Sequence, residues 1–163
     1  MPLLIRKLAP TDDVGYFDCG NSDLNEYVWY QALEEQNEGS STTYLALDDS
    51  RLVGFVSLAM SSLRVEHVEK KHLFKRSRYK NFPSLMIGRL AIVKDLQGQD
   101  FGSGLCDFAV ANAMELRNRI GCQFVIVNAK PDSITFYEKS GFQLGPSQQH
   151  RREPFMYFRL PLP

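Results

Sequence analysis

Three glycines, Gly98, Gly102 and Gly104, lie in a polar stretch between an apolar run and a pattern typical of a helix. The run from Leu85 to Val93 has the length and β-branched content of a strand buried on both faces. From Leu105 onward, apolar residues recur at helical spacing. A strand, a glycine-rich turn and a helix start bring free backbone N–H groups and the positive end of the helix dipole to one point. The stretch therefore predicts an anion-binding site. The alternative interpretation is a glycine-rich turn that only connects the strand to the helix.

Two common phosphate-binding motifs are absent from this stretch. No glycine is followed by the Lys and Ser or Thr of a G-x-x-x-x-G-K-[ST] loop. The spacing is not G-x-G-x-x-G, and the loop comes about halfway along the chain, not in a first strand–turn–helix unit. These absences argue against a nucleotide-binding P-loop and a dinucleotide-binding fold.

The stretch does resemble the cofactor motif of the GNAT superfamily of acyl-CoA-dependent N-acetyltransferases, which reads R/Q-x-x-G-x-G/A. In the register favoured by the strand ending LAIV, Gln97 opens the motif, Asp100 replaces its first glycine, and Gly102 is its second. A register that begins at Gln99 matches fully but lengthens the loop. Asp100 places a carboxylate near the expected pyrophosphate, although aspartate tolerates a left-handed backbone.

Composition sets the broad class of the protein. A chain of 163 residues predicts a single domain over 1–163 that is large enough for its own core. Its formal net charge is zero, yet residues 11–50 hold ten acidic side chains and no Lys or Arg, while residues 64–80 hold seven Lys or Arg and two Glu. Three cysteines without metal spacing and the lack of a ~18-residue apolar run favour a soluble, cytoplasmic protein without a bound metal.

Strand and helix patterns alternate along the chain. The order predicted is β α β β (α) β α β α β, an α/β layer with a mixed sheet. Ser22 is expected to cap the first helix, and Pro83 is expected to end a basic segment that is part helix and part loop. The predicted strands are 3–8, 42–47, 52–60, 85–93 with a bulge at Gly88, 122–128 and 155–160, and the predicted helices are 23–38, 105–120 and a short one from Pro131 to Gly141.

That order, together with FYEKSGF after the second buried strand, extends the resemblance to the whole chain. The resemblance implies a GNAT fold: a central, mixed and mostly antiparallel sheet with one parallel pair of strands splayed to hold acetyl-CoA, and helices on both faces. It also implies an acetyl-CoA-dependent N-acetyltransferase that acts on a primary amine. The residues it assigns to the cofactor are Leu90, Ala91 and Ile92 on the strand edge, Gln97, Gly98, Gln99, Asp100, Phe101, Gly102, Ser103 and Gly104 in the loop, and Asn128, Ser133 and Phe136 beyond it.

Tyr137 of FYEKSGF is the residue that this resemblance places near the thioester, and we expect it to act as the general acid. A phenol, with a reference pKa near 10, is protonated at neutral pH and can donate to a departing thiolate. The alternative is a core aromatic residue, a role for which Phe136 is the more natural choice. The sequence identifies no general base. Only a lysine acceptor would require one, and the choice of Glu26 or Glu34 for that role would be a guess.

A narrower resemblance lies in FDCGNSDLNEYV, TTYLAL and LVGFVSLAM, which look like the GNAT toxins of toxin–antitoxin pairs and their stand-alone relatives. Those toxins acetylate the α-amino group of aminoacyl-tRNA and are silenced by a ribbon-helix-helix antitoxin. The resemblance implies that Lys75, Arg76, Arg78 and Arg151–Arg152 hold tRNA phosphates. Open alternatives are a small amine, a polyamine or a protein N-terminus as acceptor, a non-catalytic acyl-CoA sensor, and assembly as a homodimer. His67, His72 and His150 are expected at the surface.

Overall fold

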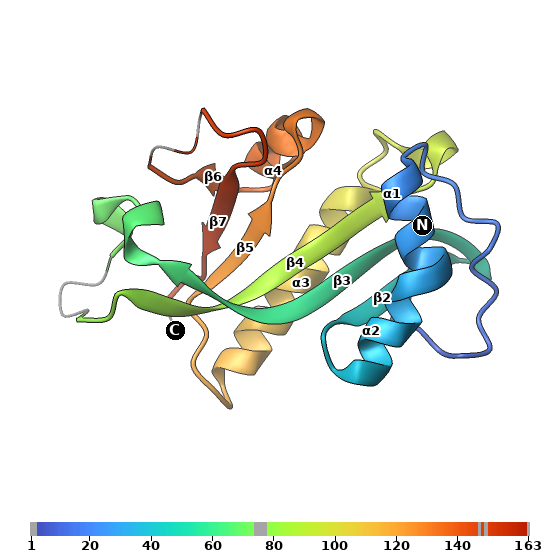
Figure 1. Cartoon of the computed structure of the whole chain (residues 1–163), viewed down its shortest axis with the longest axis horizontal. Coiled ribbons are helices and arrows are strands. Elements are labelled where there is room, and N and C mark those ends of the chain that lie inside the picture. The colour runs from blue at the N-terminus through green and yellow to red at the C-terminus, as the bar shows by residue number, and fades with distance from the viewer. Residues whose placement is uncertain (1–2, 74–77, 147, 149, 163) are drawn as a thin grey trace. The chain divides into compact units, whose positions relative to one another are not determined.

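The computed structural model describes residues 3–73, 78–146, 148 and 150–162 (Figure 1). Contacts divide the chain into two compact units. Unit 1 comprises Met1–Ala59 and Gly88–Asp107, and unit 2 comprises Met60–Ile87 and Phe108–Pro163. Hydrogen bonding orders the seven strands β1-β2-β3-β4-β5-β7-β6, which confirms the predicted mixed sheet.

Unit 1 contains an antiparallel meander formed by β1 (Leu4–Lys7), β2 (Thr42–Asp48) and the first part of β3 (Arg51–Arg64). The turn between β2 and β3 has positive φ at Asp49 and Ser50, which is the backbone of a tight two-residue hairpin. Strands β2 and β3, which the sequence predicted as neighbouring strands, therefore form a hairpin. Strand β3 extends four residues beyond the predicted end at Met60.

The helical segment of unit 1 consists of α1 (Ser22–Glu26), a π-helical segment η1 (Tyr27–Gln31) and α2 (Ala32–Glu38). The predicted cap at Ser22 is wrong, because the Asn21 side chain accepts the N–H of Leu24 at 3.1 Å. The helix ends at Gly39 with φ 80°, as predicted. In this segment Asn25 is buried, where its side chain bonds to the backbone N–H of Cys19 and to the Asp18 carboxylate, and Gln31 is exposed.

The cofactor stretch is formed by β4 (Asn81–Ile92), the 3-10 turn η4 (Lys94–Leu96) and α3 (Phe101–Arg117). Two predicted boundaries are wrong. Helix α3 begins four residues before Leu105, so Gly102 and Gly104 belong to its first turn. Pro83 lies inside β4, where its carbonyl still accepts the N–H of Gln123 at 2.8 Å. A proline fits at this position because the bond to Gln123 uses its carbonyl oxygen and requires no backbone N–H from residue 83.

Unit 2 contains the parallel pair that the GNAT resemblance implies. Strand β5 (Phe124–Asn128) pairs with β4 from Ser84↔Phe124 to Ile87↔Val127. Strand β7 (Phe155–Arg159) is antiparallel to β5, as predicted, and the two-residue strand β6 (Gln143–Leu144) adds an edge that the sequence did not reveal. Between β5 and β6 lie the 3-10 turn η5 (Pro131–Ser133) and α4 (Ile134–Lys139).

Each unit has its own apolar core. In unit 1, Phe55 packs against Phe17 with ring centroids 5.3 Å apart and stacks on Tyr27. The core of unit 2 gathers around Phe124 and Tyr157, and it includes Leu63, Val68, Phe82 and Ile126. All three cysteines are buried and free. Among the described residues, no helix has the length and apolarity needed to span a membrane.

Candidate functional site

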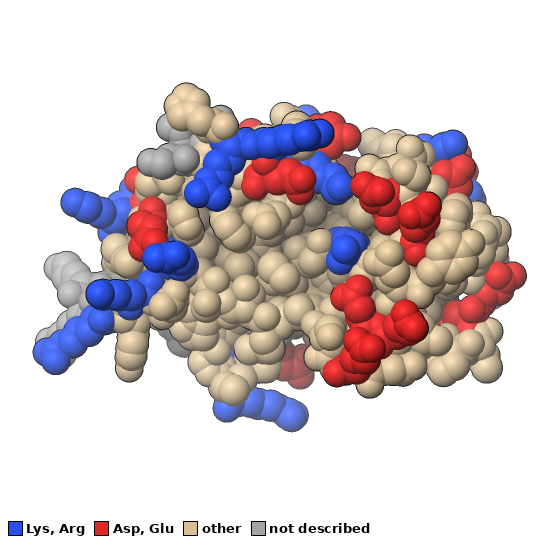
Figure 2. Space-filling model, viewed as in Figure 1, with Lys and Arg blue, Asp and Glu red and all other residues tan. Residues whose placement is uncertain are grey.

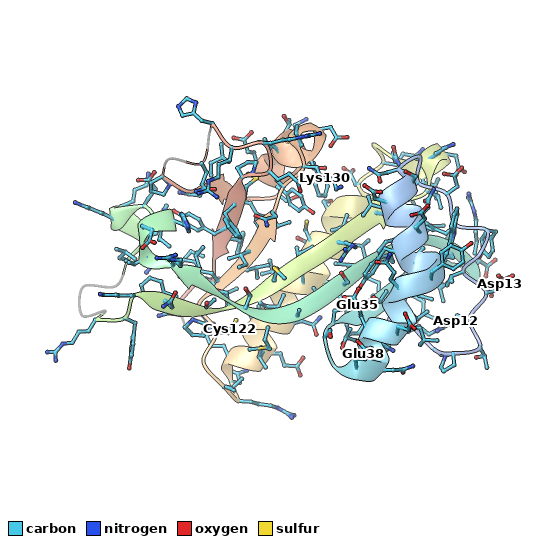
Figure 3. The ribbon with its side chains drawn as sticks, in the orientation of Figure 1. Asp12, Asp13, Glu35, Glu38, Cys122 and Lys130 are labelled. Atoms are coloured by element: carbon cyan, nitrogen blue, oxygen red, sulfur yellow. The ribbon has the colours of Figure 1, made fainter. Side chains whose placement is uncertain are left out.

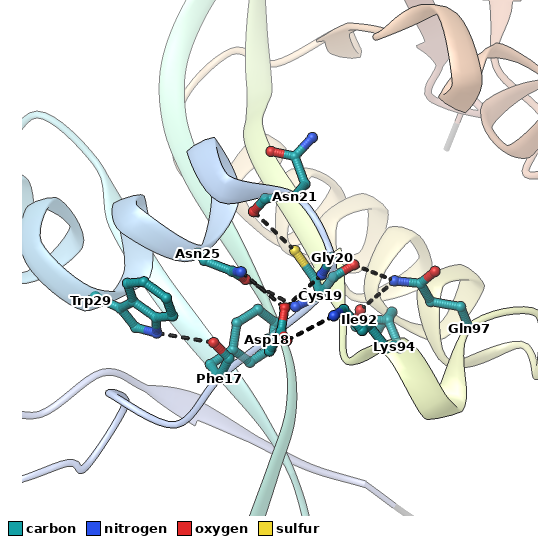
Figure 4. A network of polar contacts seen from close by, with 10 residues as sticks. All are labelled: Phe17, Asp18, Cys19, Gly20, Asn21, Asn25, Trp29, Ile92, Lys94 and Gln97. Atoms are coloured by element: carbon teal, nitrogen blue, oxygen red, sulfur yellow. Dashed lines mark hydrogen bonds and ion pairs between the residues drawn. The ribbon is translucent and has the colours of Figure 1, made fainter.

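Gln97 fixes the start of the cofactor loop. Its side-chain amide donates to the carbonyl oxygen of Ile92 at 2.9 Å and to that of Cys19 at 2.8 Å (Figure 4). One amide therefore closes the turn after β4 and attaches it to the segment before α1. This bonding explains the value of an amide at the first motif position, since both N–H groups of the side chain are used.

A second set of contacts joins the same two segments through Asp18 (Figure 4). Its carboxylate accepts hydrogen bonds from Lys94 Nζ at 3.0 Å, from the N–H of Gly20 at 2.9 Å and from Asn25 Nδ2 at 3.0 Å. The Lys94 ammonium, followed by these two neutral donors, lowers the pKa of Asp18 to about 2. The backbone N–H of Lys94 also donates to the Asp18 carbonyl. The loop after β4 is thus held against the N-terminus of α1 through the part that precedes the glycines.

Asp100 turns the chain into α3 with a left-handed backbone, φ 68°. The left-handed geometry expected for an aspartate in a glycine position is therefore confirmed. Its carbonyl accepts the N–H of Gly104 at 3.2 Å and the hydroxyl of Ser103 at 3.0 Å, while its carboxylate lies on the surface. Because Gly104 makes the first helical bond, the N–H groups of the three preceding residues have no acceptor within the helix. These groups can bind an anion.

The end of β4 offers an extended backbone edge. Parallel pairing with β5 covers Ser84–Ile87 and stops before Leu90, Ala91 and Ile92. On the β3 side, the N–H of Val93 donates to the carbonyl of Val53 at 2.9 Å. A Cβ at Gly54 would lie 2.7 Å from Ile92 Cδ1 and 2.9 Å from the Ala91 carbonyl oxygen. Glycine is thus needed for β3 to lie this close to the strand edge.

The remaining predicted cofactor residues lie in unit 2. Asn128 is exposed at the end of β5, and Ser133 and Phe136 are half-buried around the start of α4. Tyr137 is 5% exposed, and its ring contacts those of Phe136 and Phe142 at centroid distances of 5.0 and 5.5 Å. The expectation that Phe136 is the more natural core residue is wrong, because α4 turns Tyr137 further inward. Tyr137 is therefore a packing residue whether or not it also donates a proton.

The histidines differ from the surface role expected for them. His67 is half-buried and stacks on Phe155 at 5.6 Å, and His72 is half-buried with Nδ1 2.7 Å from the Tyr157 hydroxyl. Only His150 is exposed, as expected. The many Lys and Arg residues around these histidines suggested a fully solvated segment. In the structure, polar groups that are distant in sequence form hydrogen bonds with the two rings, so the rings can be partly buried.

Charge is distributed unevenly within each unit. Figure 2 shows Lys and Arg side chains over the part of unit 2 that carries the 3-10 turns η2 (Val65–His67) and η3 (Lys70–His72). In unit 1, acidic side chains follow the helical segment and the loop before it, including Asp12, Asp13, Glu35 and Glu38 (Figure 3). Arg78 is exposed, while Lys75 and Arg76 lie outside the described residues.

Two features of unit 1 were not found by sequence reasoning. The guanidinium of Arg89 lies 4.0 Å above the ring of Tyr27, a cation–π contact within the strand that carries the predicted pantetheine edge. A cavity of about 630 Å³ lies elsewhere, lined by residues such as Arg6, Asp12 and Tyr16, and it includes none of the predicted site residues. Among the described residues, no group of three or more His, Cys, Asp or Glu is arranged to hold a metal ion.

Comparison with known proteins gives one family and a consistent group of relatives. A family model described as an acetyltransferase (GNAT) domain matches residues 13–156. A tRNA-acetylating toxin of Mycobacterium tuberculosis is 29% identical over 143 residues, which are 87% of this chain and 85% of the toxin.

Solved structures of similar fold cover nearly the whole chain. The structure of AtaT complexed with acetyl-methionyl-tRNAfMet has a TM-score of 0.85 and 26% identity, and it covers 97% of this chain and 95% of that one. A structure of AtaTR bound with AcCoA has a TM-score of 0.78 and 27% identity over 97% and 94%. A mutant of KacT, with a TM-score of 0.88 over 98% and 96% at 24% identity, supports the fold alone.

Proposed function

The chain belongs to the GNAT acetyltransferase family and is an acetyl-CoA-dependent N-acetyltransferase, and we propose that its acceptor is the α-amino group of aminoacyl-tRNA. The observation that carries this proposal is the match to a tRNA-acetylating toxin over 87% of the chain. The similarity to AtaT in complex with acetyl-methionyl-tRNAfMet supports it over nearly the full length. We further propose that residues 1–163 work as one catalytic domain in the cytoplasm, where aminoacyl-tRNA is used.

The residues of the loop suit the cofactor. Acetyl-CoA supplies the acetyl group as a thioester when it is bound. The N–H groups of Phe101, Gly102 and Ser103, at the positive end of α3, would donate to its pyrophosphate. The Asp100 side chain is exposed, so its carboxylate would turn to solvent and leave these N–H groups to the pyrophosphate. Gln97 would contribute to cofactor binding indirectly, because its side-chain amide is hydrogen-bonded to backbone carbonyl groups of the protein.

The strand edge would bind the amide-rich arm of the cofactor. Leu90, Ala91 and Ile92 continue β4 beyond its pairing with β5, so their backbone can add an extended amide chain as a further strand would. We propose that Asn128, Ser133 and Phe136 line the same arm. Gly54 supports this edge from β3, since a larger residue there would displace Ala91 and Ile92.

For the chemistry, we propose that Tyr137 donates a proton to the departing thiolate. Its place in the aromatic cluster of α4 fixes the direction of the ring, because Phe136 and Phe142 contact it on two sides. The α-amine of an aminoacyl ester needs no strong base, since an α-amine has a reference pKa near 7.7–8.0 and is partly neutral at neutral pH. This chemistry does not require a catalytic carboxylate.

The basic residues of unit 2 would hold the phosphates of the acceptor. They include Arg78 and, from the sequence, Lys75 and Arg76. Since one relative structure contains AtaT with the C-terminus of the antitoxin AtaR, we also propose that this chain is paired with an antitoxin of its own. Whether it also forms a homodimer is best answered by its mass in solution.

A second acceptor class has one observation in its favour. The ten acidic side chains between residues 11 and 50 would attract a cationic amine such as a polyamine. Parallel acetylation assays on charged tRNA and on spermidine distinguish the two acceptors. Acetylation of neither substrate, despite acetyl-CoA binding, would instead support a sensor that does not catalyse.

A further inference from the structure

Two histidine-centred groups of hydrogen bonds attach the basic segment, residues 64–80, to the C-terminal part of unit 2. The first, which we call the His72 clamp, contains His72, Gln143, Tyr157 and the backbone of Glu69. The second, the His67 clamp, contains His67, Gln148 and the backbone of Phe155. The bonds that residues 67–72 make to the C-terminal part span 71 to 88 residues of sequence in the first clamp and 81 in the second, so both clamps contain long-range contacts.

In the His72 clamp, the number of donors and acceptors fixes the direction of the three bonds at the Tyr157 hydroxyl. The Tyr157 hydroxyl accepts the backbone N–H of Glu69 at 3.1 Å and an N–H of Gln143 at 2.9 Å. A phenol oxygen has two acceptor sites and one hydrogen, so its O–H remains for His72 Nδ1, 2.7 Å away. Nδ1 must therefore carry no proton. The clamp holds only a neutral imidazole.

In the His67 clamp, the direction of the hydrogen bonds can be assigned in the same way. The Oε1 atom of Gln148 accepts the backbone N–H of Phe155 at 3.0 Å, which orients the amide so that its Nε2 donates to His67 Nδ1 at 3.2 Å. Gln148 is 1% exposed. The two segments touch closely here, because an added Cβ at Gly145 would overlap the carbonyl oxygen of His67. A buried amide thus joins two stretches of chain that also carry exposed, charged side chains.

Each clamp has exposed cationic residues next to it in the chain. Lys70 and Lys71 immediately precede His72 in η3, and both are exposed. Arg151 donates its backbone N–H to the Gln148 carbonyl at 2.9 Å, and Arg151 and Arg152 are exposed. Among the described residues, none of these four side chains forms an ion pair, unlike Arg64, which pairs with Glu66. Four cationic residues from two distant segments therefore lie beside two hydrogen-bonded groups within unit 2.

We propose that His67 and His72, with Gln148 and Tyr157, are positioning residues that hold Lys70, Lys71, Arg151 and Arg152 as one phosphate-binding surface for the RNA acceptor. This inference rests on the proposed function. Without the clamps, each contact would have to order its own segment on binding, which costs affinity. With them, the surface is preorganised and the acceptor meets cations whose spacing is already set. A neutral His72 suits this place because it forms its hydrogen bonds without adding charge to a segment that already carries many charged residues.

The proposal is tested by removing the clamps while leaving the cations in place. Tyr157→Phe keeps the buried ring but removes the hydroxyl at the centre of the His72 clamp, and Gln148→Leu removes the amide of the His67 clamp. Tyr79→Phe is the matched control, because Tyr79 belongs to the same segment and is 76% exposed. Steady-state acetylation of charged tRNA is measured at two salt concentrations, and amide hydrogen exchange reports on the N–H groups of Glu69 and Phe155.

We expect each clamp variant to raise KM for charged tRNA roughly tenfold, the effect of about one to two lost neutral hydrogen bonds, with kcat little changed. The salt dependence of KM should become shallower, since fewer phosphates are contacted at once. Exchange should accelerate at Glu69 in Tyr157→Phe and at Phe155 in Gln148→Leu, while acetyl-CoA affinity stays at the parental value. Tyr79→Phe should behave as the parent.

Two results separate failure of this inference from failure of the proposed function. If the parent acetylates charged tRNA and both clamp variants keep its KM and salt slope although exchange has accelerated, the clamps have no role in acceptor binding. If the parent does not acetylate charged tRNA at all, the acceptor assignment fails and the surface fails with it. A fall in kcat without a change in KM would also overturn the inference, because it would place the clamps in catalysis instead.

Discussion

The side-chain amide of Gln97 lies 2.8 Å from the carbonyl oxygen of Cys19, although 78 residues separate them in sequence. The same amide bonds to Ile92 at the end of β4. The first motif position thus connects the cofactor loop to the segment before α1. Its role in binding is to set the start of the loop, from which Asp100 and the first turn of α3 follow.

Replacing Gln97 with leucine is expected to lower the free energy of unfolding by about 1–3 kcal/mol, because two carbonyl groups lose their donors. Affinity for acetyl-CoA should fall as well, since the loop loses its fixed start. Urea denaturation with and without acetyl-CoA measures both effects. Gln99→Leu is the control, as the Gln99 amide makes one exposed bond of 3.3 Å. Equal stability of the two variants would show that the Gln97 bonds contribute nothing.

Gly102→Val is expected to abolish acetyl-CoA binding while leaving the fold intact. Gly102 is in the first turn of α3, where a β-branched side chain is tolerated by the helix but blocks close approach of a pyrophosphate to the backbone. Calorimetric titration with acetyl-CoA gives the affinity. Gly15→Val is the matched control, because the nearest atom to an added Cβ at Gly15 is 3.8 Å away. Parental affinity in Gly102→Val would remove the loop from the cofactor site.

Tyr137→Phe should lower kcat at least ~10²-fold, at the low end of general acid catalysis, with little change in cofactor affinity. Phenylalanine preserves the ring contacts with Phe136 and Phe142, so the aromatic cluster remains packed. Tyr30→Phe, at a tyrosine that is 73% exposed, controls for the substitution itself. Full turnover in Tyr137→Phe on an accepted substrate would reduce Tyr137 to a packing residue.

The stability of the protein should decrease on mild acidification because of His72. Burial, followed by the nearby charges of Lys71 and Arg159, lowers the pKa of His72 against a smaller opposite effect of Glu69. The unfolded chain then takes up the proton at higher pH than the folded one. The contribution is therefore complete above the ordinary imidazole pKa of ~6.5 and is lost as the pH falls toward the lower folded value.

The test of this pH effect compares the parent with His72→Gln, which cannot titrate. The urea midpoint of the parent is expected to fall more steeply than that of the variant between roughly pH 7 and pH 5. Because both proteins keep His67 and His150, the difference between the two curves reports His72 alone. Parallel curves would mean that protonation of His72 does not oppose folding.

The long strands were predictable because each of them coincides with a run of apolar residues that a helix or a loop would not account for. Strand β6 was not, since two residues carry no periodicity, and it exists only through pairing with β7. The early start of α3 was missed because Gly102 and Gly104 are poor helix formers. The π-helical segment η1 was missed because one added residue in a turn shifts the pattern without a compositional signal.

For the site, the loop and Tyr137 could be found from local motifs, because the relevant residues are close in sequence. The contacts of Gln97 with Cys19 and of His72 with Tyr157 could not, as their partners are 78 and 85 residues away. The charge of neighbouring residues was also a poor guide to the burial of His72. This histidine lies among lysines in the sequence, yet the hydroxyl of a distant tyrosine in β7 forms the hydrogen bond that makes burial of its ring possible.

The central claim is that this N-acetyltransferase acts on the α-amino group of aminoacyl-tRNA. The most direct measurement is transfer from radiolabelled acetyl-CoA to charged tRNA and to spermidine by the same enzyme preparation, at two salt concentrations. We predict label on the amino acid of charged tRNA, none on uncharged tRNA, and a rate that falls steeply with salt because phosphates are contacted. Label on spermidine with charged tRNA unmodified would contradict the account.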